Sequence, residues 1–330
     1  MESTNIFNYA TSELSQDAFI CWLLSFALKE NHGKDSALEA CALDVLHQIP
    51  KLQTIESIAK IDRQVSVAYG RIDILLTIGD YLVIIEDKTF TNAACDQLLR
   101  YRKGLVEKRK ISDENVICVF YKIIEQAQAE KDVDFEFTRE KLLQLLRPYK
   151  DKINSDVFHY YVDYLEHIDN IAHLYKTQAI GEWEALTYWG FFRHLKEQGL
   201  VSKNCGWGYV ANPSGGFLGL WWDFYPGNEQ SDDFSKGCFD SVYLQIENDK
   251  IAVKLCADPI DDYDTDNVRA ARQQIFDYFA SRIDDFTKRW RLGNYMTVGY
   301  IEYNESNYRE QITKMQQIFN EMKADLKISV

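Results

Sequence analysis

Three charged residues, Asp73, Glu86 and Lys88, lie in two apolar segments that meet at Gly79 and Asp80. A Gly-Asp pair between two β-branched, apolar runs is typical of a tight β-hairpin. If Gly79 and Asp80 form a two-residue loop, the register places Asp73 opposite Glu86, with Cβ atoms roughly 5 Å apart. Glu86 and Lys88 are two residues apart and therefore point to the same side of their strand. The sequence thus predicts three charges on one face of an apolar hairpin.

Charges on a central strand are costly unless they are paired or bind an ion. One interpretation is a structural ion pair between Lys88 and either Asp73 or Glu86. The other is a divalent-cation site, in which the two carboxylates supply hard oxygen ligands for Mg²⁺ or Mn²⁺. The lysine beside them would then contact water or an anionic substrate. We favour the cation site, because the hairpin register brings all three side chains to one face.

An aspartate followed thirteen residues later by Glu-x-Lys, as in Asp73, Glu86 and Lys88, resembles the signature of the PD-(D/E)XK nuclease superfamily. Ile72 stands where that family usually has proline. The resemblance implies that Asp73 and Glu86 bind the metal, while Lys88 orients the attacking water and stabilises developing charge. It also implies an enzyme that hydrolyses phosphodiester bonds of nucleic acid, with DNA as the expected substrate.

A helix is expected over residues 12–28, with Leu14 and Leu24 on its apolar stripe. Glu13 and Asp17 lie one turn apart at its beginning, where acidic residues are favourable in any helix. The family commonly has a glutamate on an N-terminal helix that faces the metal. The resemblance therefore implies Glu13 as a further metal ligand, with Asp17 as the alternative.

A second helix is expected after the hairpin, ending near Arg109, with Gln97 and Tyr101 one turn apart. The family often has a polar residue on this helix that contacts the site, which implies a supporting role for Gln97; a solvated surface position is the alternative. We expect Tyr101 to pack in the core. The helix also carries six basic residues opposed by Glu107 alone: Arg100, Arg102, Lys103, Lys108, Arg109 and Lys110. Arg100, Arg102 and Lys103 are the predicted nucleic-acid contacts.

The remaining patterns predict an α/β fold with a C-terminal α+β accessory domain. A helix over 36–48 and strands over 65–69 and 115–121 give the order α–β–β–β–α–β, which matches the family's restriction-endonuclease-like core. The hairpin is apolar on both faces, so helices should flank the mixed sheet. Helices are expected over 137–146 and 265–290. We place the nuclease-like domain at 1–180 and an accessory domain at 181–330.

The net charge of −14 argues against a protein that coats nucleic acid, although a local basic patch can still dock phosphates. It suits a second functional class, a nuclease-fold protein that acts only as a binding or assembly subunit. A protein partner could bind through the C-terminal domain. The seven scattered cysteines and the lack of an 18-residue apolar run predict a cytoplasmic protein that does not enter a membrane.

Overall fold

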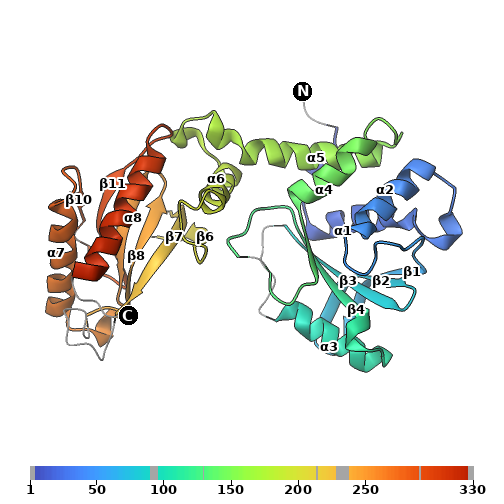
Figure 1. Cartoon of the computed structure of the whole chain (residues 1–330), viewed down its shortest axis with the longest axis horizontal. Helices are drawn as coiled ribbons and strands as arrows, with labels where there is room; N and C mark the ends of the chain where they lie inside the picture. The colour runs from blue at the N-terminus through green and yellow to red at the C-terminus, as the bar shows by residue number, and fades with distance from the viewer. Residues whose placement is uncertain are drawn as a thin grey trace. The chain divides into compact units, whose positions relative to one another are not determined.

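The chain forms two compact units, Met1–Ile171 and Ala172–Val330, in a computed structural model (Figure 1). The structure describes residues 4–89, 96–128, 130–212, 215–227, 238–289 and 291–325. Within these described residues, each unit contains one β-sheet, with five strands in the first and six in the second. The charged residues singled out in the sequence all lie in the first unit.

The first sheet has the strand order β1-β2-β3-β4-β5 and mixes antiparallel and parallel pairs. Strands β1, β2 and β3 are antiparallel neighbours, whereas β4 runs parallel to both β3 and β5. The parallel β3–β4 pair requires a crossover, which is supplied by helix α3. The strands are β1 (Lys60–Val67), β2 (Gly70–Ile78), β3 (Tyr81–Lys88), β4 (Val116–Lys122) and β5 (Phe135–Thr138).

Helices cover both faces of this sheet, as the apolar pattern predicts (Figure 1). Helix α3 packs on the face that carries Leu75 and Ile84 and forms one apolar cluster with it. Helix α1 contacts β2 and β3, and α2 packs on α1 in the opposite layer. The helices of this unit are α1 (Glu13–Ser25), α2 (Ser36–His47), α3 (Gln97–Arg109), α4 (Arg139–Leu146) and α5 (Asp156–Ala172). The predicted α–β–β–β–α–β order is confirmed.

Three expectations are wrong in detail. The helix expected over 137–146 begins only at Arg139, because residues 135–138 form strand β5 and pair with β4. Helix α7 ends at Ala280 and does not continue to residue 290, since Thr287–Lys288 forms the short strand β10. Helix α1 buries Phe19 and Leu23, whereas Leu14 is 63% exposed, so its buried face differs from the predicted stripe.

The second unit is a six-stranded antiparallel sheet in the order β10-β11-β9-β8-β7-β6. Asn248 and Asp249 form the two-residue turn between β8 and β9, in which Glu247 pairs with Lys250 and Ile246 with Ile251. Its helices share one apolar core with the sheet. The elements are α6 (Ala185–Glu197), β6 (Gly206–Val210), β7 (Phe217–Pro226), β8 (Ser241–Glu247), β9 (Lys250–Cys256), α7 (Thr265–Ala280), β10 (Thr287–Lys288), β11 (Tyr295–Glu302) and α8 (Tyr308–Asp325). Across the described residues of both units, no helix combines the length and apolarity needed to span a membrane.

Candidate functional site

The β2–β3 hairpin has the predicted register. Its pairs run from Ile78 with Tyr81 through Ile74 with Ile85, and the same count places Asp73 across from Glu86. Beyond Ile74 the ladder opens, and the Asp73 carboxylate accepts hydrogen bonds from the Asp87 backbone N–H and the Gln64 side chain, at 3.4 and 3.3 Å. Asp73 is thus fixed at the end of the hairpin that also carries Glu86.

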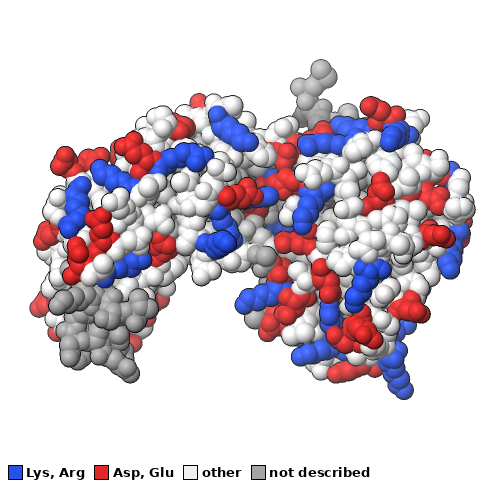
Figure 2. Space-filling model, viewed as in Figure 1, with Lys and Arg blue, Asp and Glu red and all other residues white. Residues whose placement is uncertain are grey.

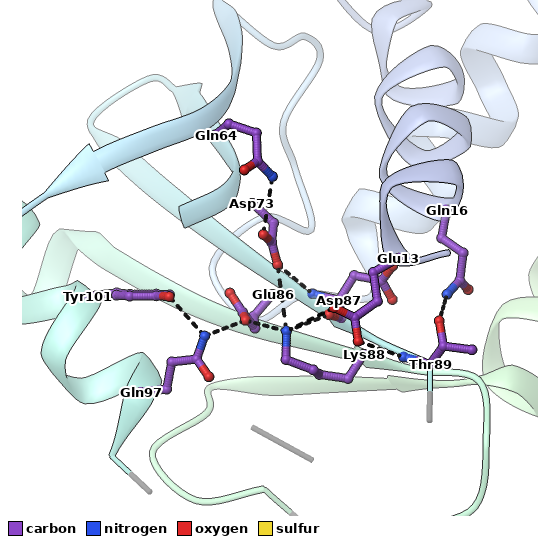
Figure 3. A network of polar contacts seen from close by, with 10 residues as sticks. All are labelled: Glu13, Gln16, Gln64, Asp73, Glu86, Asp87, Lys88, Thr89, Gln97 and Tyr101. Carbon is purple, nitrogen blue, oxygen red and sulfur yellow. Dashed lines mark hydrogen bonds and ion pairs between the residues drawn. The ribbon is translucent and has the colours of Figure 1, made fainter. Parts of the chain in front are cut away.

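Lys88 lies at the centre of a group of carboxylates (Figure 3). Its Nζ is 2.7 Å from Glu86 Oε1, 3.5 Å from Glu13 Oε2 and 4.0 Å from Asp73 Oδ2. It also donates to the Asp87 carbonyl at 2.9 Å. The Lys88 side chain is 12% exposed, so these charged groups lie in a partly desolvated environment. The three residues of the sequence motif are brought together, and Glu13 joins them from helix α1.

Glu13 and Asp17 occupy different environments on α1. Glu13 reaches the end of β3, where Lys88 and the Thr89 backbone N–H both donate to its carboxylate. Asp17 is buried, and its Oδ1 atom has no hydrogen-bond partner within the described ranges. The structure therefore places Glu13, rather than Asp17, against Lys88.

Gln97, at the beginning of α3, lies against Glu86. Its Nε2 atom is 2.6 Å from Glu86 Oε1 and 2.8 Å from the Tyr101 hydroxyl (Figure 3). Tyr101 is buried, as expected for a packing residue, but it also orients Gln97, which sequence reasoning missed. The spacing of four residues was the available signal, because it places both side chains on one helix face.

Burial and crowding of like charges shift the protonation of this group. Desolvation and the Asp73 charge raise the pKa of Glu86 to about 8, although Lys88 opposes the shift. Desolvation, again with Asp73, raises the pKa of Asp17 to about 7. Burial and the surrounding carboxylates raise the pKa of Asp87. Burial alone would lower the pKa of Lys88, but Glu86, Glu13 and Asp73 together raise it, so Lys88 remains an ammonium.

The donor set fits a hard divalent cation. Glu86 Oε1 accepts hydrogen bonds from Lys88 and Gln97, whereas Glu86 Oε2 is buried and has no hydrogen-bond partner in the part of the chain that the structure describes. In the described part of the chain, no three acidic, histidine or cysteine side chains are arranged to enclose a metal by themselves. Mg²⁺ commonly binds through one or two carboxylates and completes its shell with water and substrate oxygens. Asp73 and Glu86, with Glu13 nearby, are sufficient for that mode.

The metal-free protein is expected to lose stability as pH rises from about 4 to about 8. In this range the folded state keeps protons on Asp17 and Glu86, whose pKa values rise from 3.8 to about 7 and from 4.5 to about 8, while the unfolded chain loses them. Each increase in pH therefore favours unfolding. Denaturant unfolding in EDTA should show a decrease on the order of a few kcal/mol. Glu86→Gln should reduce the part of this decrease above pH 5. A stability that increases from pH 5 to 8 would contradict the assignment.

The basic residues of α3 have unequal surroundings. Arg100 and Lys103 are exposed and form no ion pair among the described residues. Arg102, by contrast, pairs with Asp134 and also lies 3.6 Å from Asp113. The structure thus ties Arg102 to its own domain, which weakens its predicted role as a phosphate contact. Arg100 and Lys103 keep their charges open to solvent.

Sequence analysis assigned no role to two further charged residues that lie near Lys88. Lys122 ends strand β4 directly beside Lys88 in the parallel register, and burial lowers its pKa to about 8. The charged residue that ends the apolar run 116–121 could have been noticed in the sequence. Only the pairing of β4 with β3, however, shows that this residue lies beside Lys88. Asp87 alternates to the opposite face of β3 from Glu86 and Lys88. It is fully buried, and neither of its carboxylate oxygens has a hydrogen-bond partner among the described residues.

Comparison with known proteins agrees with this geometry. No curated protein and no solved structure matches the chain. A family model described as the PD-(D/E)XK nuclease superfamily matches residues 4–187, which is more than half of the 330 residues. The match includes α1, the β2–β3 hairpin and α3, which carry Glu13, Asp73, Glu86, Lys88 and Gln97. The chain therefore belongs to the PD-(D/E)XK nuclease superfamily.

Proposed function

We propose that the first unit is a Mg²⁺- or Mn²⁺-dependent nuclease that hydrolyses phosphodiester bonds of DNA. The observation that carries this proposal is the position of the Lys88 ammonium within 4.0 Å of Asp73, Glu86 and Glu13. A structural ion pair needs one carboxylate for one lysine. Here the carboxylates outnumber the ammonium, which favours a site that takes up an additional cation.

Asp73 and Glu86 would hold the cation, with Glu13 as a third carboxylate. The bound cation would supply Lewis-acid polarisation of the phosphate and lower the pKa of water. Lys88 remains protonated, so it cannot accept the proton of the attacking water. Its ammonium instead orients water and stabilises the negative charge that develops on the phosphate. Gln97 holds the Glu86 carboxylate in place through Oε1.

We assign the docking of the substrate backbone to Arg100 and Lys103, which are exposed on α3. On the face of the molecule shown in Figure 2, basic and acidic side chains are interspersed. This distribution and the net charge of −14 favour local docking of nucleic acid over binding across a broad surface. Arg102 contributes less, because Asp134 neutralises it.

Replacing Arg100 and Lys103 with glutamine should flatten the salt dependence of DNA binding. Each phosphate contact with duplex DNA contributes a slope of about −0.9 in log K against log salt, so losing two contacts should reduce the slope by about 1.8. Fluorescence anisotropy from 50 to 300 mM salt measures this slope. The control removes two exposed lysines from the segment between α1 and α2, Lys29→Gln with Lys34→Gln. An equal effect of both double variants would contradict a specific role for α3.

A panel of single- and double-stranded DNA and RNA, tested with Mg²⁺, Mn²⁺ and EDTA, tests the function itself. Cation-dependent cleavage that is absent in EDTA supports the proposal. Binding without cleavage in either cation would support the second function, a nuclease-fold subunit for binding or assembly. We also propose a cytoplasmic location and a protein-binding role for the second unit, whose helices and sheet form a separate core.

A further inference from the structure

A buried hydrogen bond links helix α1 to the end of strand β3. The Gln16 Nε2 atom donates to the Thr89 hydroxyl at 2.5 Å, and both residues are only 2% exposed (Figure 3). Gln16 lies one turn after Glu13 on α1, and Thr89 directly follows Lys88. The bond therefore connects the two elements that carry Glu13 and Lys88.

The orientation of Gln16 is fixed by a second buried contact. Its Oε1 atom accepts a hydrogen bond from the Tyr161 hydroxyl at 3.4 Å, and Tyr161 is 2.7 Å from the hydroxyl of Tyr121. Because the carbonyl side of the amide faces Tyr161, its NH₂ side faces Thr89. Tyr161 also stacks on Phe19 of α1, with ring centroids 3.6 Å apart, which anchors the donor. These contacts therefore fix the orientation of the Gln16 side-chain amide.

The direct contacts between Glu13 and strand β3 are long by comparison. Lys88 donates to Glu13 at 3.5 Å, and the Thr89 backbone N–H donates to Glu13 at 3.4 Å. Contacts near the upper limit of hydrogen-bond distance are weak and tolerate displacement. The short bond between Gln16 and Thr89 therefore determines the spacing of α1 and β3 more strongly than Glu13 does itself.

We infer that Gln16 and Thr89 are positioning residues, which hold Glu13 at the distance from Lys88 and Asp73 where its carboxylate can join the cation site. The inference rests on the proposed function. According to it, both residues affect the affinity for the divalent cation and do not contact the nucleic acid. Residues that orient a metal-binding side chain typically change metal affinity by about tenfold or more when they are replaced.

A titration with Mn²⁺ alone, monitored by thermal unfolding, tests the inference without any cleavage assay. Thr89→Val keeps the β-branched shape and removes the hydroxyl, so it should raise the half-saturating Mn²⁺ concentration about tenfold. Thr89→Ser should restore the wild-type value. Gln16→Leu should match Thr89→Val, and the double variant should be no worse than either, because each removes the same bond. In a Glu13→Gln background, Thr89→Val should have no further effect.

Thr187→Val is the matched control, because Thr187 is a fully buried threonine in the second unit. It should lower the melting temperature without moving the Mn²⁺ midpoint. If Thr89→Val folds and retains the wild-type Mn²⁺ midpoint, or if its effect persists in the Glu13→Gln background, the inference is wrong. Absence of any Mn²⁺ response in the wild-type protein would instead overturn the proposed function, so the two failures are distinguishable.

Discussion

Asp73→Ala is expected to abolish cleavage and to remove the thermal stabilisation that Mg²⁺ gives the wild-type protein. A cation at one hundred times its dissociation constant stabilises the folded state by about 2.7 kcal/mol, and this gain requires an intact site. In metal-free buffer the same variant should lose little stability, because the Asp73 charge raises the pKa values of Glu86, Asp17 and Asp87. Thermal unfolding in Mg²⁺ and in EDTA measures the metal-induced stabilisation and the metal-free stability.

Asp80→Ala is the control for this comparison, since Asp80 is exposed in the turn of the same hairpin. It should retain both cleavage and the Mg²⁺ response. The opposite pattern for Asp73→Ala, a large loss of metal-free stability in a protein that never responded to Mg²⁺, is what a structural ion pair with Lys88 predicts. That pattern would remove the cation site and the nuclease proposal together.

Lys88→Met should lower the turnover number by roughly 10²–10³-fold while leaving the Mg²⁺ response in place. The estimate corresponds to the loss of one preorganised donor to a developing negative charge. Lys88 is not assigned to the metal, and its removal leaves the carboxylates of Asp73, Glu86 and Glu13 without the ammonium at 2.7 to 4.0 Å. Without metal, the variant should therefore be less stable than the wild-type protein. Added Mg²⁺ should stabilise the variant more than it stabilises the wild-type protein.

Single-turnover kinetics and thermal shifts on the same samples separate these effects. Lys60→Met, which removes a largely exposed lysine from strand β1, should change neither quantity. If Lys88→Met also abolishes the Mg²⁺ response, then Lys88 supports the cation site structurally, and its assignment to the chemical step is wrong.

The positions of Asp73, Glu86 and Lys88 could be predicted because a strand has a two-residue period. Once Gly79 and Asp80 are taken as a two-residue loop, every pair of the hairpin follows, and the observed register agrees through Ile74 and Ile85. Gln97 and Glu13 were expected from the family resemblance, and in the structure they contact Glu86 and Lys88 respectively. Local periodicity thus led to the three motif residues, and the resemblance led to the two that support them.

The partners that come from distant segments could not be predicted in this way. Arg102 was predicted to contact nucleic acid, because its partner Asp134 lies 32 residues away in the sequence and could not be foreseen. Gln16 was missed because the apolar stripe of α1 was drawn through Leu14, whereas the packing of α1 against Tyr161 and β3 buries the face that carries Gln16. Strand β5 has only four residues, and it could not be predicted because it depends on its pairing with β4.

The crowding of carboxylates around Lys88 has a kinetic consequence. In the absence of a divalent ion, the charges of Glu13 and Asp73 repel an incoming phosphodiester, at about 4 kcal/mol per charge pair for a separation of 4 Å and an effective dielectric constant of 20. A bound divalent ion would reverse the sign of the local field. The ion should therefore bind before the nucleic acid, and bound nucleic acid should in turn raise the affinity for the ion by the same factor. Between turnovers, the concentration of free divalent ion would then determine which protein molecules are able to engage a strand.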